Sequence, residues 1–196
     1  MKQKTGRPKT FDEEEALSIA MHLFWTKGYE KTSLSDLIEA MQLSKSSFYQ
    51  TFKSKKELYK RALGVYFDTN CNMLSQMQKH YSSKMILEMF IQSIFEEYEQ
   101  NGDVKGCLLM NSGAECHEKY PDIISVVSSY YEMGIEQYAK LIEDAQNQGD
   151  IKNPMDAKEI ATLFYSALTG MNNTIKAGAP KEAIVTIMES IKRLIS

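Results

Sequence analysis

The chain has few of the residues that build disulfide frameworks or metal sites. Its 196 residues include only 3 cysteines, Cys71, Cys107 and Cys116. They are odd in number and lack a CxxC or zinc-site spacing, so we expect reduced thiols rather than a disulfide framework. Cys116 and His117 are adjacent, but a metal site at this pair would lack a third ligand.

Long apolar segments and enzyme motifs are also missing. No apolar run reaches ~18 residues, and the amino-terminal segment carries acids rather than an apolar signal core, so we expect neither a membrane span nor export, and a cytoplasmic protein. The histidines are scattered, and the patterns GxGxxG, GxxxxGK[ST], GxSxG and HExxH do not occur. We therefore predict no catalytic residue, no metal and no cofactor.

The charge of the chain is divided unevenly. Residues 1–60 contain 11 Lys and Arg against 8 Asp and Glu, whereas the remaining residues contain 12 against 18, within a net charge of −3. Hydrophobic residues at 43% and charged residues at 25% are ordinary for a soluble globular protein. A basic amino-terminal part on an acidic body indicates that one end faces a polyanion such as DNA.

Residues 32–52 contain two short helical patterns joined by a tight turn. In the first, apolar residues recur at i, i+3, i+4 and i+7, namely Leu34, Leu37, Ile38 and Met41. Ser33 and Asp36 can start this helix, and Ser44 can start the second. This arrangement is typical of a helix-turn-helix.

The second helix of this pair has a polar outward face. Phe48 and Phe52 are expected to point inward, while the outward side chains are small, hydroxylated, amide or cationic: Ser44, Lys45, Ser46, Ser47, Tyr49 and Gln50. Such side chains suit a DNA major groove, where they can reach phosphates and base edges. The alternative is an ordinary helix pair with a solvated polar face.

Both flanks of this stretch are basic. Residues 1–10 form an arm in which Arg7 could enter a minor groove, although a merely solubilising tail would look the same. After the stretch, Ser54 and Glu57 form a capping-box pattern with Lys55 in the first turn. A lysine there is unfavourable for the helix dipole, so we interpret Lys55 as a phosphate contact at the helix start.

The rest of the chain also follows helical periodicity, and we predict an all-α fold of about nine helices. The first helix runs from Asp12 to Gly28, and the expected later helices cover 54–80, 83–101, 111–117, 121–149, 153–178 and the segment after Pro180. We divide the chain into a DNA-binding domain at residues 1–54, with its basic arm, and a helical sensing and dimerisation domain at residues 55–196.

The segment GRPKTFDEEEALSIAMHLFWTKGYEKTSLSDLIEAMQLSKSSFYQTFKSKKELYKRAL resembles the amino-terminal domain of TetR-type (tetracycline-repressor-like) transcriptional regulators. The specific marks are the basic arm before FD, the passage KGYEKTS, and SKSSFYQTFKSKKEL. The resemblance implies a homodimer that binds a near-palindromic operator and receives a signal in its helical body. It places the DNA contacts at Ser33, Lys45, Ser46, Ser47, Tyr49, Gln50 and Lys55. Ser46 stands where many members have Gly or Pro, so base preference does not transfer.

The helical body offers two candidate signals. The first is a small apolar or aromatic ligand held among Phe90, Ile94, Tyr98, Met110, Tyr130, Tyr131 and Phe164, with polar contacts from Asn111, His117 or Asn172. Core packing is the alternative for each of these residues. The second signal is chemical modification of Cys107, which follows a Lys-Gly turn and resembles a passage in family members that sense electrophiles or oxidants. The alternative is an inert buried cysteine.

The last two predicted helices carry continuous apolar stripes. These stripes could pack within the chain, or two pairs of helices could form a four-helix dimer interface. The residues concerned are Phe164, Leu168, Met171, Ile184, Ile187, Met188, Ile191 and Leu194. The sequence thus favours a dimeric repressor released by a ligand or by thiol modification. An activator or a constitutive DNA-binding protein stays open, whereas a helical enzyme or binding protein without DNA function would need a constellation that the sequence lacks.

Overall fold

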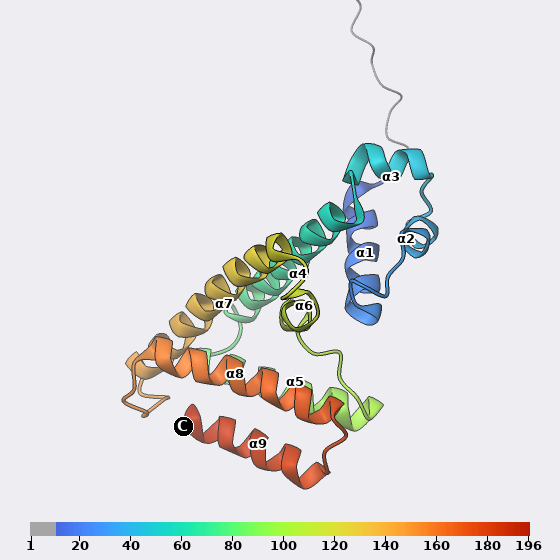
Figure 1. Ribbon diagram of the computed structural model, residues 1–196. Helices are drawn as coiled ribbons and strands as arrows, with labels where there is room; N and C mark the ends of the chain where they lie inside the picture. Colours follow the sequence, from blue (N-terminus) through green and yellow to red (C-terminus); the bar gives the residue numbers. More distant parts are fainter. Residues whose placement is uncertain (1–10) are drawn as a thin grey trace, which may run out of the picture. The chain divides into compact units, whose positions relative to one another are not determined.

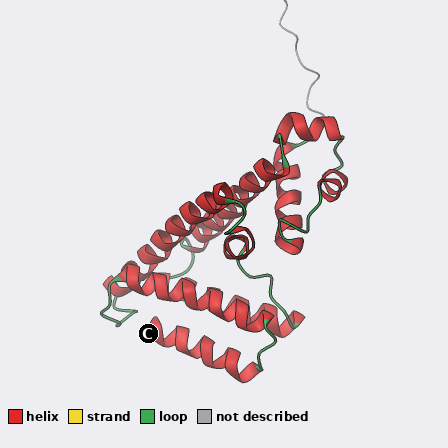
Figure 2. Cartoon of the chain, in the orientation of Figure 1, coloured by secondary structure: helices red, strands yellow, loops and turns green. Residues whose placement is uncertain are grey.

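The computed structural model describes residues 11–196, and in this range the chain consists of helices joined by short loops, without any β-strand (Figures 1 and 2). The predicted all-α fold is confirmed. The helices are α1 (Glu13–Lys27), α2 (Leu34–Ala40), α3 (Lys45–Phe52), α4 (Lys55–Met77), α5 (Ser83–Asn101), α6 (Leu108–Cys116), α7 (Pro121–Asn147), α8 (Ala157–Lys176) and α9 (Lys181–Leu194). None of these helices is long and apolar enough to cross a membrane.

Most helix starts follow from a polar residue that caps free backbone N–H groups. The Asp12 carboxylate accepts from the amides of Glu14 and Glu15 at 2.9 and 3.3 Å. Ser82 caps α5 in the same way. At the other end of α5, Gly102 adopts a φ of 69° and donates its amide to the Tyr98 carbonyl, a conformation that favours glycine.

Three predicted boundaries differ from the structure. α4 ends at Met77 rather than near residue 80, because the amides of Lys79 and His80 bond to carbonyls only three residues back. α6 begins at Leu108, three residues before Asn111. α8 begins at Ala157 with Asp156 as its cap, because Asn153 instead bonds outside the helix, to the Leu194 carbonyl at 3.0 Å.

The chain divides into two compact units, with the boundary between Tyr66 and Phe67 inside α4. The boundary predicted from the sequence lies between residues 54 and 55, immediately before α4, which is twelve residues earlier. In the first unit, buried aromatic rings form the core: Phe24, Phe48, Phe52 and Tyr59. The rings of Phe24 and Tyr59 meet edge to face at 4.6 Å. Burying each such ring stabilises the fold by about 1.5–3 kcal/mol.

The second unit is a helical bundle. α7 packs against α5, α6 and α8, and α9 packs against α5 and α8. α8 and α9 lie side by side in opposite directions (Figure 1). Fully buried residues of α5, α7, α8 and α9 share one apolar core, for example Ile86, Leu141, Phe164 and Ile184.

Most residues that we predicted at a dimer interface belong to this core, so that prediction was wrong for them. Six are buried within the chain: Phe164, Leu168, Met171, Ile184, Met188 and Ile191. Ile187 and Leu194 are partly exposed and can still contact another subunit. An amphipathic stripe shows which side of a helix is buried, but it does not show whether the partner is the same chain or a second one.

Candidate nucleic-acid interface and sensing cluster

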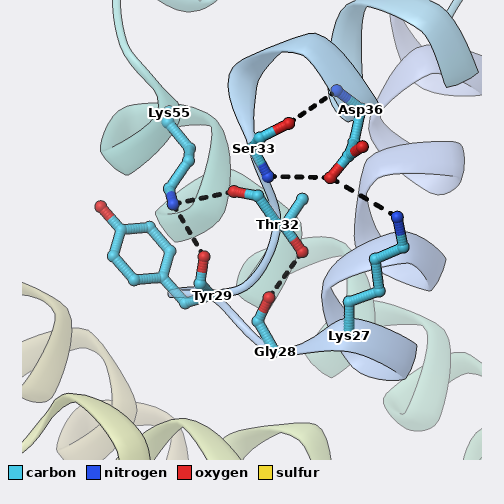
Figure 3. Close-up of polar contacts among 7 residues, drawn as sticks. All are labelled: Lys27, Gly28, Tyr29, Thr32, Ser33, Asp36 and Lys55. Carbon is cyan, nitrogen blue, oxygen red and sulfur yellow. Dashed lines mark hydrogen bonds and ion pairs between the residues drawn. The ribbon is translucent and has the colours of Figure 1, made fainter.

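The loop before α2 and the start of α2 are fixed by side-chain contacts (Figure 3). The Ser33 hydroxyl accepts from the Asp36 amide, and the Asp36 carboxylate accepts from the Ser33 amide, both at 3.0 Å. This predicted helix start is therefore confirmed as a capping box. The Ser33 amide, with its hydroxyl and the nearby Lys27 ammonium at 3.5 Å, holds the pKa of Asp36 below its ordinary value.

α3 has the orientation that the sequence pattern indicates. Ser44 caps it, accepting from the Ser47 amide at 3.1 Å. Phe48 and Phe52 are buried, whereas Tyr49 is 46% exposed. Around Tyr49, the predicted DNA-contacting side chains Ser44, Lys45, Ser46 and Gln50 are exposed, and Ser47 is partly exposed. The turn before α3 is tight because Gln42 takes a φ of 53°.

Lys55 has a partner that the sequence did not reveal. Its ammonium donates to the carbonyls of Tyr29 and Thr32 at 2.8 and 2.9 Å and lies 4.3 Å from the centre of the Tyr29 ring (Figure 3). These carbonyls account for a lysine at this helix start without a phosphate, and the phosphate contact of Lys55 stays a prediction. Sequence reasoning missed them because backbone carbonyls leave no sequence signal. Arg7 lies outside the described residues.

In the second unit, aromatic residues gather around Tyr138 and Tyr165. The Tyr138 ring lies 5.7 Å from Phe90, 5.6 Å from Phe164 and 5.7 Å from Tyr165. Tyr165 in turn lies 5.6 Å from Tyr131, and its hydroxyl is 3.2 Å from the Cys107 sulfur. We call these six residues the tyrosine cluster: Phe90, Cys107, Tyr131, Tyr138, Phe164 and Tyr165.

Four residues of the tyrosine cluster were predicted from the sequence as candidates for the sensing site. The other two, Tyr138 and Tyr165, were not. Tyr138 could have been found, because it lies two helical turns after Tyr131 and faces the same side. Burial, together with the nearby Cys107 sulfur, raises the pKa of Tyr138 well above its ordinary value. The Tyr138 hydroxyl therefore stays protonated at neutral pH and can donate a hydrogen bond to a ligand.

Other predicted ligand residues lie elsewhere or have other partners. Tyr130 stacks on Phe67 at 4.7 Å instead of joining the cluster. The Asn111 amide donates to the Lys105 carbonyl at 3.0 Å, which fixes the loop before α6. Ile94, Tyr98 and Met110 are partly buried, and Asn172 is buried.

His117 is exposed rather than enclosed, and its role in the ligand site stays a prediction. Its side chain is 68% exposed, next to Glu118 at the end of α6, whereas Cys116 is buried. The two side chains therefore do not face a common site. Across residues 11–196, no three His, Cys, Asp or Glu side chains lie together in a way that could hold a metal ion.

Comparison with known proteins identifies the family. Residues 16–62 match the bacterial regulatory proteins of the tetR family, and residues 86–191 match the tetracyclin repressor-like C-terminal domain. The chain belongs to the tetR family. It is a DNA-binding transcriptional regulator, and α2 and α3 are the helix-turn-helix of this tetR-family protein.

Named relatives of this tetR-family chain include repressors. It is 28% identical over 202 residues to the HTH-type transcriptional repressor ComR of Escherichia coli (strain K12), covering 99% of this chain and 93% of ComR. It is 29% identical over 129 residues to the repressor BdcR of the same strain, covering 64% of this chain and 63% of BdcR.

Solved structures of the tetR family show the same fold. A cysteine mutant of the regulator CifR, complexed with 26-bp operator DNA, has a TM-score of 0.77 and 25% identity, covering 95% of this chain and 98% of that one. The reduced form of E. coli NemR has a TM-score of 0.82 and 19% identity, covering 93% and 96% of the two chains.

Proposed function

We propose that this protein is a transcriptional repressor that binds a near-palindromic operator as a homodimer through the outward face of α3. The observation that carries the proposal is the division of α3 into a buried side, with Phe48 and Phe52, and an exposed side around Tyr49. The repressors ComR and BdcR, to which the chain is similar, support the same assignment.

Each exposed side chain of α3 suits a contact with duplex DNA. Lys45 can pair with a phosphate, and Gln50 can bond the edge of an adenine. Ser46 is small enough for the helix backbone to come close to the bases. Tyr49 offers a ring and a hydroxyl, and 46% of its area is available to a partner. Ser33, one residue before α2, adds a hydroxyl within reach of the backbone.

A dimer is needed because one helix-turn-helix contacts only a half-site. The exposed sides of α8 and α9 can form the dimer interface. Most of the residues on these sides differ from those predicted from the sequence. On α8, Leu163 is 48% exposed, and Ala167 and Gly170 follow at i+4 and i+7. On α9, Ile187 and Leu194 are partly exposed. Small residues beside apolar ones allow two helix pairs to approach closely in a four-helix interface.

The signal is received at the tyrosine cluster. Its rings can contact a small apolar or aromatic molecule, and the Tyr138 and Tyr165 hydroxyls can hydrogen-bond polar groups on it. Cys107, beside the Tyr165 hydroxyl, offers a second route, because alkylation of its sulfur would add bulk inside the cluster. Ligand binding or alkylation releases DNA only if it favours the conformation that has the lower operator affinity. The protein reaches this conformation through a movement of α4.

Fluorescence anisotropy with the DNA upstream of the protein's own gene tests this proposal. At about 100 mM salt we expect a specific complex that a scrambled duplex of equal length does not compete away. Tyr49→Ala should weaken this complex and leave the dimer intact. If the wild-type protein binds both duplexes equally, the repressor assignment is wrong.

A further inference from the structure

The turn between α2 and α3 closes with backbone hydrogen bonds that usually go with a glycine. The Leu43 amide donates to the Ile38 carbonyl at 3.0 Å. The Gln42 amide donates to the Glu39 carbonyl at 3.1 Å. Together these bonds form a Schellman motif, in which the first residue beyond the helix cap takes a positive φ and is usually glycine. Here that residue is Gln42, with a φ of 53°.

The same motif ends α7 and α8, and at both places the chain has glycine. Gly149 and Gly178 stand at the position of Gln42, with φ values of 78° and 72°. In all three turns, this residue and the next donate their amides to the carbonyls three and five residues earlier. A side chain in this conformation brings its Cβ close to the following carbonyl oxygen, a strain that glycine avoids. Among residues 11–196, the only other non-glycine residue with a positive φ is Lys53, at the opposite end of α3.

The turn is held without the side chain of Gln42. On either side, Met41 and Leu43 are buried and anchor the chain in the core, whereas Gln42 is exposed. Its side-chain amide makes no hydrogen bond with any described residue. Packing and the backbone bonds therefore fix the turn, and the amide of Gln42 is available to another molecule.

This amide lies next to the amino-terminal end of α3, the end that contacts base edges in a helix-turn-helix. The neighbouring Ser44 hydroxyl is already bound to Ser47, to its amide at 3.1 Å and to its hydroxyl at 2.8 Å. Because Gln42 is in the turn and not on the outward face of α3, it faces the edge of the groove, where the phosphates run. Glutamine amides are common donors to phosphate oxygens, and such contacts fix the position of a protein on the duplex.

We propose that Gln42 is a further DNA-contacting residue, whose side-chain amide donates to a phosphate oxygen at the edge of the major groove and fixes α3 on each half-site. This inference rests on the proposed function. It explains why the chain keeps a strained side chain at a position where it elsewhere has glycine, since strain of this kind gathers at functional sites. The amide adds affinity for DNA and lowers the stability of the turn.

Gln42→Gly tests the proposal because stability and affinity should change in opposite directions. Removing the strained side chain should raise the melting temperature, followed by circular dichroism, by about 2–4 °C. Operator affinity should fall at least about fivefold, since each of two half-sites loses one hydrogen bond. A role in the turn alone predicts the higher melting temperature with unchanged affinity, and that result would overturn the proposal. A melting temperature that does not rise would remove the strain on which the inference depends.

Two further variants separate the loss of the amide from the flexibility of glycine. Gln42→Ala keeps a side chain at the positive φ, so its melting temperature should stay close to that of the wild type while its affinity falls as in Gln42→Gly. Gly149→Gln puts the same side chain into the same motif after α7, where an added Cβ meets no atom within 4 Å. It should lower the melting temperature and leave operator affinity unchanged. If Gln42→Ala binds operator like the wild type, the amide makes no contact with DNA.

A charge at this position tests whether the partner is a phosphate. Gln42→Lys should steepen the slope of log K against log salt concentration by about 2, because each phosphate contact contributes about 0.9 and a dimer has two. An unchanged slope would exclude a phosphate within reach. The wild type is measured first on its own upstream DNA and on a scrambled duplex. Equal binding to both would refute the proposed function, whereas specific binding that Gln42→Gly and Gln42→Ala retain in full would refute this inference alone.

Discussion

Phe48 and Tyr49 are neighbours on α3, but we expect their substitution by alanine to have different effects. Phe48→Ala should mainly lower stability, and Tyr49→Ala should mainly weaken operator binding. Phe48 is 0% exposed and its ring lies 5.7 Å from Phe52, so Phe48→Ala leaves a cavity in the core of the first unit. Such a change lowers the free energy of unfolding by about 3–5 kcal/mol. That is comparable to the whole stability of a domain of this size, at roughly 0.05–0.15 kcal/mol per residue.

Tyr49→Ala should cost far less stability. The ring is 46% exposed, and its main aromatic contact is an edge-to-face arrangement with Phe48 at 5.5 Å. Losing that contact and the partial burial amounts to about 1 kcal/mol. Its effect on the operator complex should be larger, about 1–3 kcal/mol for each half-site, if the ring contacts DNA.

Two assays on both variants decide this prediction. Urea unfolding followed by circular dichroism should show a large shift for Phe48→Ala and a small one for Tyr49→Ala. Operator anisotropy, at a temperature where the variant is folded, should show weak binding for Tyr49→Ala. If Tyr49→Ala instead unfolds the first unit, or binds operator as well as the wild type, then the exposed side of α3 around Tyr49 is not the DNA-binding surface.

Three further predictions concern the dimer, the thiol and pH. Leu163 is 48% exposed, and burying this exposed area in both subunits would stabilise the dimer by roughly 2 kcal/mol. Leu163→Asp should therefore raise the dimer dissociation constant at least about 30-fold in sedimentation equilibrium. Its neighbour Thr162→Asp serves as the control, and an unaffected Leu163→Asp dimer would exclude this surface. Cys107→Ser should abolish release of operator by N-ethylmaleimide while Cys71→Ser retains it; equal release from both would remove Cys107 as the sensor. The pKa of Asp36 is lowered from 3.8 in the folded state, so its stabilising effect is present above that value and disappears as the pH falls below it. Urea unfolding should therefore show that Asp36→Asn is less stable than the wild type at pH 6 and that the difference shrinks towards pH 3.

Local signals in the sequence were enough for the helix-turn-helix. Ser33, Asp36 and Ser44 predicted two helix starts, and the structure confirms each by a hydrogen bond to a backbone amide. The spacing of Phe48 and Phe52 predicted which side of α3 is buried. These features depend on residues within one or two turns of each other, and such short-range interactions can be read from spacing.

Long-range partners could not be predicted in the same way. Lys55 bonds to backbone carbonyls, which every residue possesses, so nothing in the side-chain pattern marks Tyr29 and Thr32 as its partners. The stripes on α8 and α9 predicted burial correctly, but they were assigned to a second subunit instead of to the chain's own core. The tyrosine cluster was found only in part, since its members come from α5, α7, α8 and the loop before α6.

The central claim is that a dimer binds a near-palindromic operator through α3. The most direct test is a hydroxyl-radical footprint on the DNA upstream of the protein's own gene. We expect two protected half-sites related by twofold symmetry and separated by about one helical turn or a multiple of it. Tyr49→Ala should lose this protection at concentrations where the wild type shows it. Protection of a single unsymmetrical site, or none at any concentration that gives a folded dimer, would contradict the account.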